Sequence, residues 1–257
     1  MSPYLRSFSY IQNRALRPSS CITQRRSTSM QIETSTLKAI LWDMDGTLID
    51  SEPMWIDSER ELMAQFGYLW SKADGDICLG GPMTRVCKYM KEKSQSDLPE
   101  EWFGDELRRT MLAKIKSGVT LMPGAYQLLM EAKEQGIDQA LVSASDRPIV
   151  DQVLSANPGI FAFAIAAGDM ERTKPDPLPY LEAARRFGVH PSDCLVVEDS
   201  KVGVTSGLAS GALVLALAHF EQVPDSENIL VRKGLEELSL DDLKEMHQLW
   251  RSRKALI

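Results

Sequence analysis

The chain has 257 residues, of which 44% are hydrophobic and 25% are charged, as in globular proteins with room for a large core and a smaller insertion. The net charge is −7, and without residues 1–30 it becomes −12, because 24 Lys and Arg then face 36 Asp and Glu. A body this acidic excludes nucleic acid as a partner. The sequence contains no run of about 18 apolar residues, so it predicts no membrane-spanning helix.

Residues 1–35 form a leader of distinct composition. As far as Met30 it contains five arginines, many serines and no acidic residue, and it lacks a periodic apolar face. Two interpretations stay open. An organellar transit peptide would place the protein in the mitochondrial or plastid matrix. Translation starting near Met30 would instead give a soluble cytoplasmic protein.

The folded body opens with a short β-prone run, Leu37–Trp42, which ends in acidic residues. The next stretch reads as helical, because apolar residues recur at three- and four-residue spacing over Glu59–Phe66 and Arg85–Lys93. Since this helical block interrupts an otherwise alternating pattern, we predict that residues 53–118 are an inserted helical domain.

From residue 119 onward, β-prone runs alternate with helical ones. The predicted strands are 139–142, 162–166, 194–197 and 213–217, and the predicted helices are 125–135, 148–154 and 178–187. Such alternation favours a parallel sheet covered on both faces. We therefore predict an α/β protein whose core, residues 36–52 and 119–257, is a Rossmann-like, doubly wound parallel sheet.

In an open parallel sheet, ligands bind at the carboxyl ends of the strands. The polar residues that follow the predicted strands are Asp43, Asp45, Ser143, Lys174, Glu198 and Asp199. One carboxylate could attack phosphorus, and a second could move a proton to and from the reacting oxygens. Mg²⁺ prefers such oxygen ligands, and a lysine and a hydroxyl can bind phosphoryl oxygens. The set therefore indicates phosphoryl transfer with Mg²⁺.

These residues stand in a recognisable order. The run Asp43-Met-Asp-Gly-Thr-Leu-Ile-Asp-Ser-Glu52 resembles the first motif of the haloacid dehalogenase (HAD) superfamily. Ser143 resembles its second motif, Lys174-Pro-Asp-Pro its third and Glu198-Asp-Ser its fourth. The resemblance spans nearly all of residues 37–218. It is nearest to the subgroup of β-phosphoglucomutase-like proteins and sugar phosphatases with a small helical cap.

The resemblance implies a role for each residue. Asp43 would be the nucleophile and a Mg²⁺ ligand, and Asp45 the general acid and base, with its backbone carbonyl also facing the metal. Ser143, the Ala144 amide and Lys174 would bind the phosphoryl group, although Ser145 is a rival to Ser143. Asp199 would bind Mg²⁺, with Glu198 as a ligand beside it or just behind it. The block 53–118 would be the cap.

The sequence is compatible with three functions. The resemblance implies a phosphatase acting on a small phosphorylated metabolite, such as a sugar or sugar-alcohol phosphate, since Asp45 is present where dehalogenases lack the acid. The alternative is a phosphosugar mutase, which we rank second because Ser51–Asp57 contains no histidine. A non-catalytic binding protein ranks third, because both Asp43 and Lys174 are present. The sequence is compatible with a monomer and does not itself determine the oligomeric state.

Overall fold

The computed structural model of the protein describes residues 37–78, 83–217 and 226–256. The predicted leader, residues 1–35, and the cellular location that depends on it lie outside these ranges. Within them, no helix combines the length and the apolar character needed to cross a lipid bilayer.

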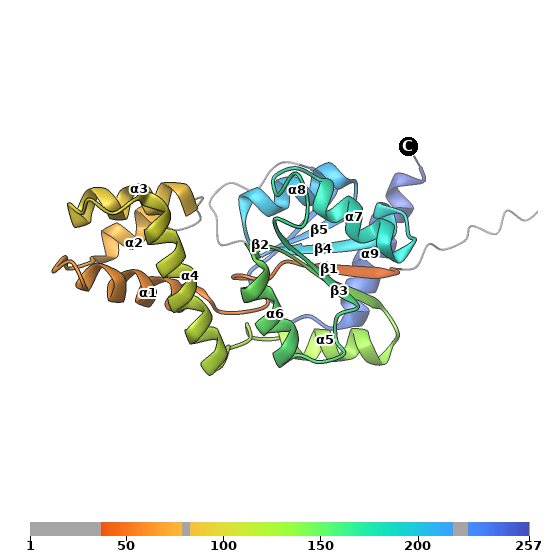
Figure 1. Ribbon diagram of the computed structural model, residues 1–257. Coiled ribbons are helices and arrows are strands. Elements are labelled where there is room, and N and C mark those ends of the chain that lie inside the picture. Colours follow the sequence, from red (N-terminus) through yellow and green to blue (C-terminus); the bar gives the residue numbers. More distant parts are fainter. Residues whose placement is uncertain (1–36, 79–82, 218–225, 257) are drawn as a thin grey trace, which may run out of the picture. The chain divides into compact units, whose positions relative to one another are not determined.

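A six-stranded parallel sheet forms the centre of the described fold (Figure 1). Its strands lie in the order β3-β2-β1-β4-β5-β6. They are β1 (Ala39–Trp42), β2 (Asp138–Asp146), β3 (Phe163–Ala167), β4 (Cys194–Glu198), β5 (Leu213–Leu217) and β6 (Ile229–Arg232). The order runs outward from β1 in both directions, as in a doubly wound sheet, and this confirms the predicted α/β, Rossmann-like class.

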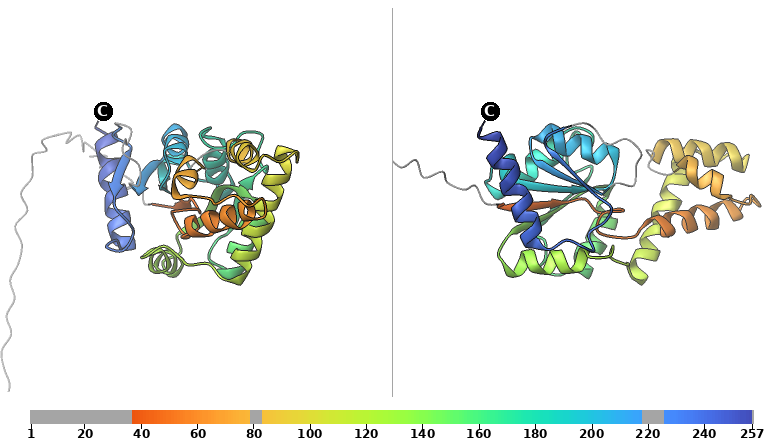
Figure 2. Two further views of the ribbon diagram at one scale, coloured as in Figure 1. Left: turned by 90° about the vertical axis from the view of Figure 1, so that its left-hand side faces the viewer. Right: turned by 180° about the vertical axis from the view of Figure 1, so that it is seen from behind.

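Helices cover both faces of the sheet (Figures 1 and 2). Because side chains alternate along a strand, Ile40 and Trp42 pack on one face of β1, and Ala39 and Leu41 pack on the other. The first face is covered by α5 (Ala125–Glu134), α6 (Arg147–Ala156) and α9 (Leu240–Lys254), and the second by α7 (Leu178–Phe187) and α8 (Lys201–Ser210). Two apolar cores therefore hold β1 rigidly from both sides.

Four helices follow β1 and build an apolar cluster of their own, which includes Met63, Met90 and Phe103. They are α1 (Glu52–Ala64), α2 (Lys72–Cys78), α3 (Met83–Ser94) and α4 (Glu100–Ser117). The chain leaves the sheet and returns to it through paired segments: the amide of Asp50 donates to the carbonyl of Thr120 at 2.9 Å. The domain boundaries, 36–52 and 119–257 for the core and 53–118 for the cap, stay a prediction.

The structure corrects two details of the sequence analysis. β2 does not end at Val142 but continues to Asp146, and its register with β3 shifts between these residues. Ser143 is therefore part of the irregular end of a strand rather than the residue after it. In addition, the sequence analysis assigned no element beyond 217, where the structure has β6 and α9.

Candidate active site

The structure gathers the predicted site residues at the carboxyl edge of the sheet. Asp43 follows β1, and Glu198 and Asp199 lie at the end of the adjacent strand β4. Lys174 arrives on the loop between β3 and α7, which is fastened by Asp176: its carboxylate accepts the Leu178 amide, and its backbone carbonyl accepts the hydroxyl of Ser206. Strand order and loop anchoring together determine where the functional groups meet.

Lys174 lies at the centre of the site. Its Nζ is 2.6 Å from Asp43 Oδ1 and 2.6 Å from Glu198 Oε1, and it donates to the Val142 carbonyl oxygen at 2.7 Å. All three ammonium protons are thus used. Burial alone would lower the pKa of Lys174, but the carboxylates of Asp43 and Glu198 outweigh it and raise the pKa, so the lysine stays charged.

A third carboxylate, Asp199, joins the two that contact Lys174. Asp43, Glu198 and Asp199 each offer an oxygen, and the three oxygens lie within 4.8 Å of one another. Burial and then the Glu198 charge raise the pKa of Asp43 above its usual range, although Lys174 offsets part of this. The same two causes raise the pKa of Asp199 to about 7. A set of oxygen donors that repel one another fits a hard cation such as Mg²⁺.

Two hydroxyl groups bind the carboxylate of Asp45. Ser51 donates to its Oδ1 at 2.6 Å, and Ser145 donates to its Oδ2 at 2.6 Å. Both carboxylate oxygens therefore have a fixed donor, which sets the orientation of the group. The sequence analysis weighed Ser145 only as a rival to Ser143, and it gave Ser51 no role.

Ser143 and Ala144 lie in the irregular end of β2. The Ser143 hydroxyl oxygen accepts the Ser145 amide at 2.9 Å, which leaves its proton available for a further acceptor. Ser143 is buried and Ala144 is exposed. Ser145 is thus engaged with Asp45, whereas the Ser143 hydroxyl proton has no acceptor among the residues that the structure describes.

Two glycines make room for the carboxylates. Gly46 has φ of +79°, and a Cβ atom there would overlap Asp199 Oδ2. This agrees with the tight turn expected after the first motif. Gly203, in the first turn of α8, lies so close to Glu198 that a Cβ atom would overlap its carboxylate.

Three further side chains belong to the site, and the sequence analysis gave none of them a role. The hydroxyl of Tyr180, on α7, donates to Glu198 Oε1 at 2.7 Å. Ser200, the N-cap of α8, donates its hydroxyl to Glu198 Oε2 at 3.1 Å. Thr47 donates to Asp199 Oδ1 at 3.3 Å. Ser200 and Thr47 stand inside the quoted motifs, whereas Tyr180 carries no sequence signal beyond its place six residues after Lys174.

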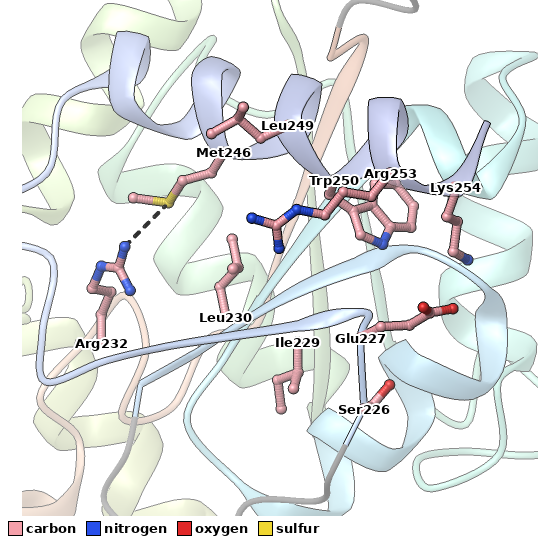
Figure 3. A pocket seen from close by; sticks show the side chains of 10 residues that line it. All are labelled: Ser226, Glu227, Ile229, Leu230, Arg232, Met246, Leu249, Trp250, Arg253 and Lys254. Atoms are coloured by element: carbon pink, nitrogen blue, oxygen red, sulfur yellow. Dashed lines mark hydrogen bonds between the residues drawn. The ribbon is translucent and has the colours of Figure 1, made fainter. Parts of the chain in front are cut away.

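A cavity of about 390 Å³ lies elsewhere, between β6 and α9. Figure 3 shows Leu230, Met246 and Trp250 along it, with the guanidinium groups of Arg232 and Arg253 nearby. None of its lining residues belongs to the carboxylate cluster. Its lining includes one carboxylate, Glu227, and lacks the second acid that the predicted chemistry needs, so the candidate active site is the sheet edge.

Known proteins are similar to this chain in sequence and in fold. A family profile described as "Haloacid dehalogenase-like hydrolase" matches residues 40–217, a range that contains every site residue named above. Hexitol phosphatase A of Escherichia coli (strain K12) is 30% identical over 210 residues, which cover 79% of this chain and 94% of that protein.

Two further comparisons are with a longer relative and with a solved structure of lower sequence identity. The bifunctional riboflavin kinase/FMN phosphatase of Arabidopsis thaliana is 31% identical over 184 residues, and the match covers 69% of this chain but only 48% of that protein. This chain thus matches about half of that relative. The crystal structure of CbbY from Rhodobacter sphaeroides in complex with phosphate superposes with a TM-score of 0.69 at 24% identity, covering 80% of this chain and 99% of CbbY. At that identity the likeness shows the fold alone.

Proposed function

The chain belongs to the haloacid dehalogenase-like hydrolases, and we propose that it hydrolyses a small phosphorylated metabolite with Mg²⁺, using Asp43 as nucleophile. Family membership and the named relatives confirm the predicted enzyme class, a HAD-like phosphatase. The observation that carries the proposal is the buried lysine between two carboxylates, 2.6 Å from each. We propose a sugar or sugar-alcohol phosphate as substrate, and the similarity to hexitol phosphatase A supports this choice.

The proposed reaction has two steps. In the first, an Asp43 oxygen attacks phosphorus, the bond from phosphorus to the alcohol oxygen breaks, and Asp45 gives its proton to the leaving oxygen. In the second, water attacks phosphorus, Asp45 accepts a proton from that water, and the bond between phosphorus and Asp43 breaks. Inorganic phosphate leaves, and both carboxyl groups return to their starting forms. The two serine hydroxyls that orient Asp45 support its part in both steps.

The phosphoryl oxygens would be bound by Lys174, the Ser143 hydroxyl and the Ala144 amide. Lys174 would attract them through its positive charge, because its three protons already point to fixed acceptors and its position is set before any substrate arrives. Donors that are oriented in advance need no rearrangement when charge develops on the transferring group. The free proton of Ser143 supports its choice over Ser145.

Asp43, Asp199 and the backbone carbonyl of Asp45 would hold Mg²⁺, with Glu198 beside them. When bound, the ion neutralises charge on the carboxylates and on the phosphoryl oxygens. The closeness of three carboxylate oxygens to one another supports this assignment, since the one ammonium group that pairs with two of them cannot balance three negative charges.

We further propose that residues 53–118, which contain α2–α4 and all of α1 but its first residue, act as a cap that selects the substrate and shields it from water. Trp55 supports a link between cap and sheet, because it packs against the apolar clusters of both.

The direct test is phosphate release from a panel of sugar, sugar-alcohol and nucleoside monophosphates, using the full chain with Mg²⁺. Release from the sugar or sugar-alcohol esters, lost in Asp45→Asn, is the expected result. If no ester releases phosphate, but β-glucose 1-phosphate is converted to glucose 6-phosphate, the protein is a mutase and the proposal is wrong. No reaction of either kind would overturn both functions.

A further inference from the structure

Tyr180 joins the apolar core to the candidate active site. Its side chain is fully buried among the residues that pack α7 and α8 against the sheet, including Ala183 and Val204. From that core its hydroxyl reaches Glu198 Oε1 at 2.7 Å. A phenol in such surroundings needs a hydrogen-bond partner, because burying the hydroxyl without one is costly. The packing of the ring therefore determines where the donor points.

Donors fill the acceptor sites of Glu198. Oε1 accepts from Lys174 Nζ at 2.6 Å and from Tyr180 at 2.7 Å. Oε2 accepts from the Ser200 hydroxyl at 3.1 Å and from the Ser200 amide at 3.4 Å. An ionised carboxylate offers about four lone-pair positions, so these four donors leave none unused. Asp199 differs, since among the described side chains only Thr47 donates to it.

Tyr180 also contacts the lysine that Glu198 holds. The Nζ of Lys174 lies 5.1 Å from the centroid of the Tyr180 ring, within the range of a cation–π interaction. One side chain thus contacts both members of the buried ion pair, through its hydroxyl on one side and its ring on the other. A shift of Tyr180 would move both groups.

We propose that Tyr180 and Ser200 are positioning residues that keep Glu198 turned toward Lys174 and out of direct coordination of the cation. Asp43 and Asp199 are then the carboxylates that bind Mg²⁺, and Glu198 aims the lysine. The inference rests on the proposed function, and it places Glu198 behind the metal ligands rather than among them, the alternative that the sequence left open.

The test is Tyr180→Phe, which removes the hydroxyl and keeps the ring. With a position on Oε1 freed, Glu198 can turn to the cation, so we expect Mg²⁺ to bind about threefold more tightly or better in calorimetric titration of the metal-stripped full chain. Because Lys174 loses its fixed partner, kcat should fall about tenfold, which corresponds to a barrier higher by about 1.4 kcal/mol, while KM changes less than about threefold.

Ser210→Ala is the matched control, since it removes another buried hydroxyl, bonded to the Gly207 carbonyl at 2.6 Å, away from the carboxylates. It should lower thermal stability without changing Mg²⁺ affinity. If Tyr180→Phe did not fold, Ser200→Ala would test the same idea, because it removes the hydroxyl donor to Oε2 and should also tighten Mg²⁺ binding.

Mg²⁺ affinity that is unchanged or weaker in the folded variant would overturn the inference. The titration does not depend on turnover, so it separates this outcome from a failure of the proposed function, in which the wild type would release no phosphate from any ester.

Discussion

The close approach of Gly203 to Glu198 makes Gly203→Ala a sharp test of the site's packing. The new methyl group would overlap the Glu198 carboxylate, which is fully buried and has no open space to move into. Displacing it breaks the hydrogen bonds from Lys174 and Tyr180. Breaking a buried, hydrogen-bonded charge pair costs about 3–5 kcal/mol. In a chain of this length that lowers the melting temperature by about 10 °C, and phosphatase activity should fall with it.

Gly75→Ala is the matched control for Gly203→Ala. Gly75 is also in a helix, α2, but the atoms nearest to an added Cβ, on Glu59 and Trp70, are 3.9 Å away. There the methyl group fits, and alanine should stabilise the helix by about 0.5–1 kcal/mol. The assay is thermal unfolding followed by circular dichroism. If Gly203→Ala melted at or above the wild-type temperature, the described packing around Glu198 would be wrong.

Three further predictions follow from the site and from α9. EDTA should abolish phosphate release and Mg²⁺ should restore it, so turnover that persists in EDTA would contradict the metal site. Ser145→Ala removes one of the two donors to Asp45 and should lower kcat about tenfold in steady-state assays, with an unchanged value counting against that contact. Burial lowers the pKa of His247 to about 4, below its unfolded value near 6.5, so protons favour the unfolded chain between these values. The free energy of unfolding should therefore fall by about 2 kcal/mol from pH 7 to pH 5. In His247→Phe the same free energy, measured by urea titration, should fall less, and an equal fall in both proteins would refute this.

The central sheet was predictable because its signals are local. Leu37–Trp42 is apolar and β-prone, and the acidic residues after it mark a strand end at a catalytic edge. β6 was missed although Ile229, Leu230 and Val231 are β-prone, because the run is short, ends in Arg232 and lies at the sheet edge. α9 was missed although Ser239 and Asp242 form a capping box, a signal that the sequence does contain.

The acidic and basic site residues were predictable for a different reason. Asp43, Lys174 and Asp199 stand in motifs whose order and placement after strands the sequence displays directly. Tyr180 could not be found in this way, because its contact with Glu198 depends on how α7 packs on the sheet. The Ser145 contact likewise depends on the register shift at the end of β2, which brings its hydroxyl to Asp45.

The most direct test of the central claim is to look for the phosphoryl group on Asp43. The reaction of the full chain with a substrate ester would be quenched in acid during turnover. The protein would then be digested and the masses of its peptides measured by mass spectrometry. We predict that the peptide containing Asp43 gains the mass of one phosphoryl group, and that Asp43→Asn shows neither this peptide nor phosphate release. Turnover without phosphorylation of that peptide, or phosphate release by Asp43→Asn within about tenfold of wild type, would contradict the account.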